Sequence, residues 1–108
     1  MGYLTKDKIK EILASNKELL KKYKVKSLAL FGSSVRGEMT SQSDIDFLVE
    51  FDNSAFGKDF EGYFDNYFGL LFSLEQIFKT KIDLLTMDMI SPYIKSYILK
   101  EAEYFEAA

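Results

Sequence analysis

The 108-residue sequence contains no cysteine and no histidine. Without cysteine, the chain can form no disulfide, thiol nucleophile or thiolate metal site. Without histidine, it can form no Ser-His-Asp triad, no His-ligated zinc site and no imidazole general base. Any chemistry must therefore come from carboxylates, hydroxyls, Lys, Arg and Tyr, together with an ion taken from solution.

Long hydrophobic runs are also missing. No window approaches the roughly 20 apolar residues that a membrane-spanning helix needs, and the N-terminus, MGYLTKDKIKEIL, lacks the apolar segment of a signal peptide. We therefore expect a cytoplasmic protein that does not contact membranes. The net charge of −3 and the pI near 5.0 argue against a protein that holds nucleic acid through its phosphates. A single nucleotide needs only a local site, so nucleotide binding is not excluded.

Hydrophobic residues make up 47% of the chain, which is enough for the core of one domain spanning residues 1–108. Apolar periodicity and turn residues predict helices and strands in the order α-β-α-β-α-β-α. The third of these elements is a turn that includes a short helix. The predicted ranges are 5–23, 25–31, 33–43, 44–51, 60–78, 81–86 and 87–105, with Pro92 in the first turn of the last helix. The expected fold is α/β or α+β, a small mixed sheet flanked by helices.

Two aspartates, Asp44 and Asp46, stand at the start of the second predicted strand. On a strand their side chains leave the same face, roughly 7 Å apart, so both can reach one or two divalent ions. Ligation by oxygen alone selects Mg²⁺ or Mn²⁺. Glu50 is roughly 13 Å from Asp46 and too far to share that ion. Asp83 is the acidic residue inside the third predicted strand, where an acid is costly unless it is paired or bound to a metal.

The first strand ends abruptly at Gly32, which lets the backbone come close to a ligand. Ser33 and the amides that follow could donate hydrogen bonds to phosphate. Arg36 could add a charged contact to the same phosphates, although a lone arginine is as often a solvated charge. Phosphate donors beside cation ligands describe a holder for a metal-bound nucleoside triphosphate.

The stretch GSSVRGEMTSQSDID, together with the later IDLL, resembles the minimal nucleotidyltransferases (MNT) of the DNA polymerase β superfamily. Their pattern is Gly-Ser, about ten residues, Asp-x-Asp, and then a third acid on a later strand. Val35 departs from it, since MNT proteins usually carry alanine there. The resemblance covers nearly the whole chain and implies a polymerase β-like nucleotidyltransferase core.

The resemblance also implies roles for individual residues. Gly32 and Ser33 would contact the triphosphate of ATP, the substrate. Asp44, Asp46 and Asp83 would hold two Mg²⁺ ions, or Mn²⁺, and would form the catalytic set. Asp83 would also assist deprotonation of the acceptor hydroxyl. In such an in-line displacement, two metals stabilise the entering and leaving oxygens.

MNT proteins are commonly encoded beside a helical HEPN ribonuclease toxin, to which they bind as antitoxins and transfer AMP from ATP. The resemblance therefore implies a HEPN-type partner with a tyrosine hydroxyl as acceptor. Two alternatives stay open. The chain could transfer nucleotides to a small molecule such as an aminoglycoside, together with a second subunit. It could also be a non-catalytic module that neutralises its partner by occlusion alone.

The segment 56–78 is rich in aromatic residues that cover more than one helical stripe. One face of this helix must be core. The surplus residues Tyr63 and Tyr67, with Phe56 and Phe60, are predicted to form a patch that contacts another protein or a second copy of this chain. A wider core under the small sheet is the alternative. Base stacking is disfavoured by the acidic charge.

Overall fold

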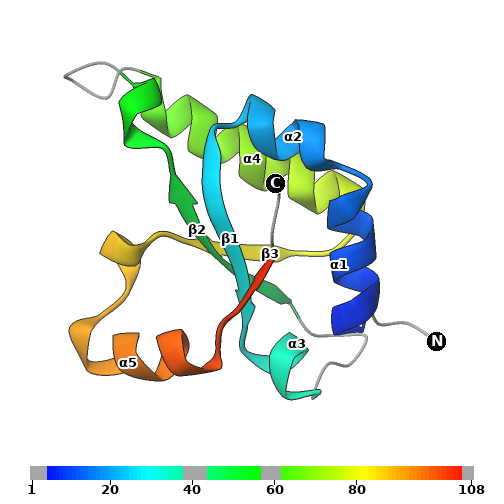
Figure 1. The fold of residues 1–108 in the computed structure, drawn as a ribbon, viewed down its shortest axis with the longest axis vertical. Coiled ribbons are helices and arrows are strands. Elements are labelled where there is room, and N and C mark those ends of the chain that lie inside the picture. The colour runs from blue at the N-terminus through cyan, green and yellow to red at the C-terminus, as the bar shows by residue number, and fades with distance from the viewer. Residues whose placement is uncertain (1–4, 38–43, 57–61, 106–108) are drawn as a thin grey trace.

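A four-stranded mixed sheet lies at the centre of the computed structural model, which describes residues 5–37, 44–56 and 62–105 (Figure 1). The strand order is β3-β2-β1-β4, with β1 antiparallel to β2 and to β4, and β2 parallel to β3. The strands are β1 (Val25–Phe31), β2 (Ile45–Phe51), β3 (Ile82–Leu85) and β4 (Glu103–Phe105). The predicted mixed α+β architecture is confirmed.

Five α-helices and two short 3₁₀ helices connect these strands in the described ranges. They are α1 (Lys6–Ala14), α2 (Lys17–Lys22), α3 (Ser33–Arg36), η1 (Asn53–Ala55), α4 (Tyr63–Phe78), η2 (Met87–Met89) and α5 (Pro92–Glu101). Within the described part of the chain, no helix combines the length and the apolarity that crossing a membrane requires.

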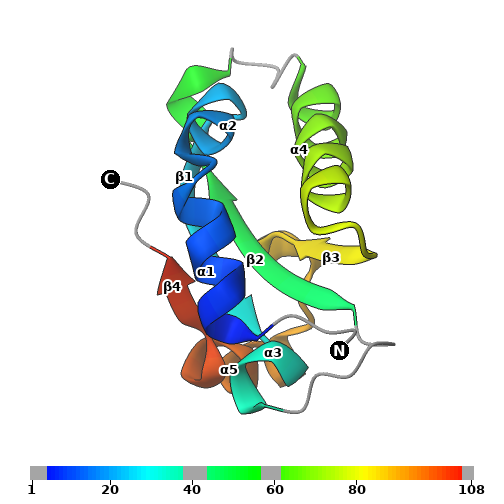
Figure 2. The same ribbon diagram turned by 90° about the vertical axis from the view of Figure 1, so that its right-hand side faces the viewer.

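The larger core lies between one face of the sheet and helices α1, α2 and α4, where α1 and α2 follow one another and α4 lies to their side (Figure 2). Alternate residues of β1 and β2 supply the strand side of this core, as a period of two requires. The fully buried side chains include Leu28, Leu30, Ile45, Phe47 and Val49 from the strands and Ile9, Leu13, Leu20, Leu70 and Leu74 from the helices.

The opposite face of the sheet carries a smaller core and, beyond it, the acidic residues. Ala29, Phe31 and Leu48 pack there against Ile90 and against Ile98 of α5. This explains why Leu48 is apolar although it lies on the face opposite the larger core. Because side chains alternate along β2, Asp46 leaves the same face as Leu48 and lies at the open end of this smaller core.

The predicted first helix is interrupted. The Ser15 hydroxyl donates to the Glu11 carbonyl, and the Asn16 side-chain amide donates to the Ile12 carbonyl at 2.8 Å. Such side-chain bonds to the backbone compete with helix continuation. The chain therefore ends α1 at Ala14 and starts α2 at Lys17.

The predicted last helix, residues 87–105, is too long at both ends. Ser91 caps α5 by accepting a hydrogen bond from the Tyr93 amide, and Pro92 is its first residue, as predicted. After Glu101 the chain extends and adds β4 to the free edge of β1, with Ala29 opposite Tyr104. A three-residue edge strand has no local pattern of its own, so the local sequence resembled the end of a helix.

The aromatic residues of α4 are distributed differently from the prediction. Tyr67 is buried and its hydroxyl donates to the Leu84 carbonyl, while Tyr63 is half-buried. The exposed residues are instead Phe64, Phe68 and Phe72, four positions apart and 71%, 59% and 63% exposed. Placing Tyr63 and Tyr67 in an exposed patch was therefore wrong, because a tyrosine can bury its ring and still pair its hydroxyl.

Two further members of that predicted patch have different outcomes. Phe56 is half-buried and packs against the Tyr63 ring. Phe60 lies outside the described residues. The predicted contact of this segment with a partner or a second copy stays a prediction.

The orientation of α4 about its own axis depends on its close contact with Tyr23 at the end of α2. Asn66 donates its side-chain amide to the Tyr23 carbonyl at 2.7 Å. One turn later, a Cβ atom at Gly69 would lie 2.6 Å from Cε1 of Tyr23. The glycine therefore permits a contact between two helices that any larger residue would obstruct.

We expect Gly69→Ala to destabilise the protein, although alanine is favoured over glycine inside helices by about 1 kcal/mol. The free energy of unfolding should fall by about 1–2 kcal/mol because the Tyr23 ring must move. Urea denaturation measures this change. In a Tyr23→Ala background the added methyl group has room, so the same substitution should stabilise the chain. A gain in stability in the wild-type background would contradict the close approach.

Candidate active site

The parallel pairing of β2 with β3 brings two of the predicted site residues together. Asp46 and Asp83 occupy equivalent positions on these neighbouring strands, and Phe31 of β1 stands on the other side of Asp46. Both aspartates are half-buried, and the Asp83 carboxyl lies close enough to raise the pKa of Asp46. Two acids from strands that are far apart in sequence thus share one spot on the sheet.

The surroundings of Asp46 favour its protonated form. Burial has the largest effect, followed by the hydrogen bond and the charge of Asp83 and by the charge of Asp44; together they raise the pKa of Asp46 to about 6. Arg36 acts in the opposite direction and is therefore close enough to influence the site. Without a cation between them, the two neighbouring carboxyls hold a proton more tightly than an isolated aspartate does.

The backbone at Gly32 lies directly against this pair. Gly32 has φ +75° and ψ −148°, a conformation that only glycine adopts readily. A Cβ atom at this position would be 2.3 Å from Oδ2 of Asp46. Gly32 is thus required both by its conformation and by the space that Asp46 takes.

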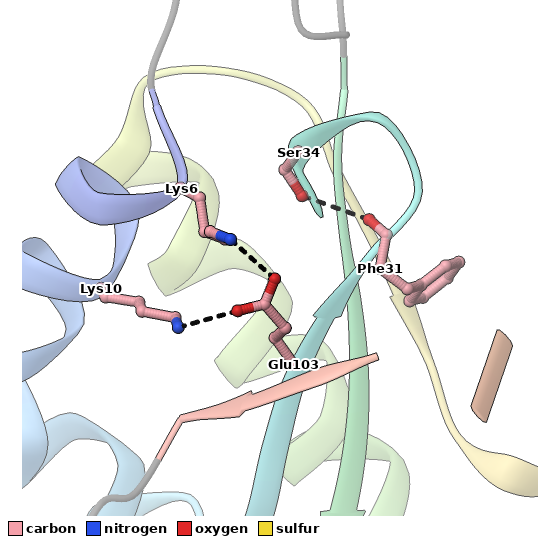
Figure 3. Close-up of polar contacts among 5 residues, drawn as sticks. All are labelled: Lys6, Lys10, Phe31, Ser34 and Glu103. Carbon is pink, nitrogen blue, oxygen red and sulfur yellow. Dashed lines mark hydrogen bonds and ion pairs between the residues drawn. The ribbon is translucent and has the colours of Figure 1, made fainter. Parts of the chain in front are cut away.

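The short helix α3 follows this turn, with Ser33 as its first residue and half-buried. The buried Ser34 hydroxyl donates to the Phe31 carbonyl at 3.2 Å and ties the turn to the end of β1 (Figure 3). Ser33 therefore directly follows the glycine that lies against Asp46.

A residue that the sequence did not single out completes the turn. Glu101, at the end of α5, accepts the Gly32 amide at 2.8 Å with one carboxylate oxygen and pairs with Nη1 of Arg36 at 2.5 Å with the other. The Gly32 amide therefore donates to a side chain of the protein itself. No local pattern could have identified Glu101, because it lies 65 positions from Arg36 in the sequence.

Asp44, the third predicted metal ligand, lies just before β2, and its carboxylate forms an ion pair with Lys81. Its Oδ2 is 3.8 Å from Nζ of Lys81, in an ion pair whose side chains are 37% and 70% exposed. Among the residues that the structure describes, no three acidic side chains lie close enough together to hold one metal ion. The structure thus brings Asp46 and Asp83 together, whereas Asp44 lies near them and pairs with Lys81.

The carboxylates present fit a hard divalent cation. Asp46 and Asp83 offer only oxygen atoms, and their mutual repulsion, which a proton relieves in the metal-free chain, would be relieved equally by a cation. Asp44 could join them by leaving Lys81, and a solvent-exposed ion pair of this kind is worth only about 0–1 kcal/mol. Asp46 and Asp83 are therefore the residues that would hold a metal ion, with Asp44 as an additional ligand.

The raised pKa of Asp46 predicts how stability depends on pH in metal-free buffer. Between the ordinary pKa of 3.8 and the folded value of about 6, the folded chain binds more protons than the unfolded chain. The free energy of unfolding therefore falls as the pH rises through this range. Asp46→Asn, which cannot ionise, should be more stable than the wild type by about 1 kcal/mol at neutral pH, a discounted figure for a half-exposed group.

Thermal unfolding with a chelator, at a series of pH values, measures this difference, which should vanish near pH 4. Asp52→Asn is the matched control, since the hydrogen bonds from Ser54 lower the pKa of Asp52. That variant should gain no stability at neutral pH. Equal melting temperatures of wild type and Asp46→Asn at every pH would show that the two carboxyls do not interact.

Comparison with known proteins agrees with this geometry. The family profile described as a nucleotidyltransferase domain matches residues 8–105. A relative from Methanocaldococcus jannaschii, named as a protein adenylyltransferase, is 47% identical over 102 residues, which cover 93% of this chain and 97% of the relative. The protein adenylyltransferase MntA of Thermococcus cleftensis is 32% identical over 108 residues, covering 96% and 99% of the two chains.

Solved structures share the fold at lower sequence identity. One named as a minimal nucleotidyltransferase has a TM-score of 0.74 at 22% identity and covers 95% of this chain and 98% of its own. The MntA-HpeT toxin–antitoxin has a TM-score of 0.61 at 18% identity, covering 97% and 75%. With the Gly-Ser turn placed against the Asp46–Asp83 pair, the family profile and the relatives in sequence show that the chain is an enzyme of the nucleotidyltransferase family, related to protein adenylyltransferases.

Proposed function

We propose that this chain is an Mg²⁺-dependent cytoplasmic adenylyltransferase that transfers AMP from ATP to a hydroxyl group of a partner protein. The observation that carries the proposal is the register of the parallel strands, which aligns Asp46 with Asp83 beside the Gly32 turn. One side of this arrangement offers cation ligands, and the other carries Ser33 and Arg36, which would donate to a phosphate group. Metal-bound ATP needs both.

The reaction itself asks for positioning and charge stabilisation more than for covalent chemistry. The acceptor oxygen forms a bond to the α-phosphorus of ATP, the bond to the β-phosphate oxygen breaks, and pyrophosphate leaves. Bound Mg²⁺ ions supply charge stabilisation at the entering and leaving oxygens. Asp46, Asp83 and Asp44 would hold them, and Asp83 would take the proton of the acceptor hydroxyl.

The turn would position the triphosphate. Gly32 lets the backbone lie directly against the acidic pair without a side chain. Ser33, at the start of α3, would donate to phosphate oxygens. Arg36, half-exposed and close enough to affect Asp46, would add positive charge on the same side.

The acceptor we propose is a tyrosine hydroxyl of a HEPN-type toxin, with this chain acting as its antitoxin. Two lines support this choice. The relatives that match almost the whole chain are named as protein adenylyltransferases, MntA among them. A structural neighbour belongs to the toxin–antitoxin MntA-HpeT.

The direct test combines this chain, Mg²⁺, ATP and a HEPN-type partner protein, followed by mass spectrometry of both chains. We expect the partner to gain the mass of one AMP and to lose this gain when its acceptor tyrosine is changed to phenylalanine. Asp46→Asn and Asp83→Asn should each lower the transfer rate about a hundredfold or more, because metal ions contribute several kcal/mol at the transition state. Asp44→Asn should also lower the rate.

Glu50→Gln is the matched control, since Glu50 lies on β2 but is exposed and bonds to Ser27 outside the site. It should transfer AMP at the wild-type rate. Unchanged transfer by Asp46→Asn would refute the site. Neutralisation of the toxin that survives loss of both Asp44 and Asp46 would identify a module that acts by occlusion. Pyrophosphate release that requires an aminoglycoside would identify a small-molecule acceptor.

A further inference from the structure

The C-terminal segment carries two carboxylates that hold different parts of the molecule. Glu101 binds the Gly32 amide and Arg36. Two residues later, Glu103 of β4 pairs with Lys6 at 2.8 Å and with Lys10 at 3.3 Å, both on α1 (Figure 3). One acid is thus joined to the candidate active site and the other to the first helix.

From this arrangement we infer that Glu101 is a positioning residue, which holds the Gly32 turn and Arg36 in the geometry that receives the triphosphate. This inference rests on the proposed function, since it concerns how the same site binds its nucleotide. Glu101 itself would not touch the ATP. It would act through the backbone amide and the guanidinium group that it binds.

The turn is held by one local side-chain contact and by Glu101. Gly32 can adopt many backbone conformations, and its positive φ is not favoured over others by local sterics. Helix α3 contains four residues and cannot stabilise itself. The Ser34 hydroxyl ties the turn to the end of β1. The Gly32 amide donates a charge-assisted hydrogen bond to Glu101 of α5, which restricts the turn from a distant part of the chain.

The electrostatics of Glu101 agree with a fixed contact. The Gly32 amide and Arg36 hold the pKa of Glu101 below its ordinary value, so the carboxylate is charged at neutral pH. Its side chain is 23% exposed, against 50% for Arg36. The pair therefore keeps the guanidinium at the edge of the site without burying it.

Contact with Glu101 does not exclude contact of Arg36 with phosphate. A guanidinium group carries five N–H donors in a planar fork, and the ion pair with Glu101 uses Nη1. The opposite interpretation is that the Glu101 carboxylate takes the place of a phosphate and must leave before ATP binds. The two interpretations predict changes of opposite sign when Glu101 loses its charge.

The experiment measures the affinity of the full chain for Mg²⁺ with a non-hydrolysable ATP analogue by calorimetry, in wild type, Glu101→Gln and Glu101→Ala. Glutamine keeps an acceptor for the Gly32 amide but loses the charge that faces Arg36, so we expect about a threefold loss of affinity. Alanine loses both contacts, so we expect about a tenfold loss, consistent with one charge-assisted hydrogen bond. In an Arg36→Ala background, Glu101→Gln should have little further effect, because the two side chains act as a unit.

Glu103→Gln is the matched control. It removes an ion-paired carboxylate from the same segment but touches only Lys6 and Lys10, so it should leave the nucleotide affinity unchanged. Equal nucleotide affinity in wild type, Glu101→Gln and Glu101→Ala would overturn the inference and leave Glu101 with a structural role only. Tighter nucleotide binding by Glu101→Gln would also overturn the inference, because it would show that the Glu101 carboxylate occupies the position of a phosphate. If Glu101→Ala does not fold, the nucleotide affinity of Glu101→Gln is sufficient to test the inference.

Failure of the proposed function would be seen separately. A wild-type chain that binds the Mg²⁺–nucleotide complex but never modifies its partner would refute AMP transfer. The Glu101 comparison would still be read from the binding measurements. Hydrogen exchange of the Gly32 amide gives a second readout without nucleotide, and it should become faster in Glu101→Ala but not in Glu103→Gln.

Discussion

The repulsion between two carboxyl groups on neighbouring parallel strands is the constraint on which the rest of the site depends. The sheet register places Asp46 opposite Asp83, in half-buried positions where charge is poorly solvated. Two like charges at such a position raise the free energy of the fold unless a proton or a cation lies between them. An arrangement that costs stability in the metal-free chain is readily explained if its purpose is to bind a cation.

The surrounding structure brings two further parts of the molecule against this pair. The smaller core of Phe31, Leu48 and Ile98 lies on the same face of the sheet as Asp46. The Gly32 turn meets Asp46 without a side chain, since a Cβ atom there would collide with it. Glu101 then joins this turn to the end of α5.

Much of this could be predicted from local sequence. The alternation of Ile45, Phe47 and Val49 predicts the strand and its buried face, and Asp46 then has to leave the other face. Pro92 marks the first turn of α5 correctly. The errors have a common cause. The side-chain bond of Asn16 that ends α1, and the pairing of Tyr104 opposite Ala29, depend on contacts that no periodicity reports.

The sequence by itself determined the kind of chemistry that the chain can carry out and the residues able to perform it. A chain without histidine or cysteine is limited to carboxylates, hydroxyls, Lys, Arg and Tyr together with an ion from solution, and the spacing from Gly32 to Asp46 is a local property. Only the tertiary structure decided which carboxylates meet. Three contacts join segments that are distant in the sequence. They are the pairing of Asp46 with Asp83, the ion pair of Asp44 with Lys81 and the hydrogen bond that the Gly32 amide donates to Glu101. They depend on strand register and helix packing, which are set by the whole core.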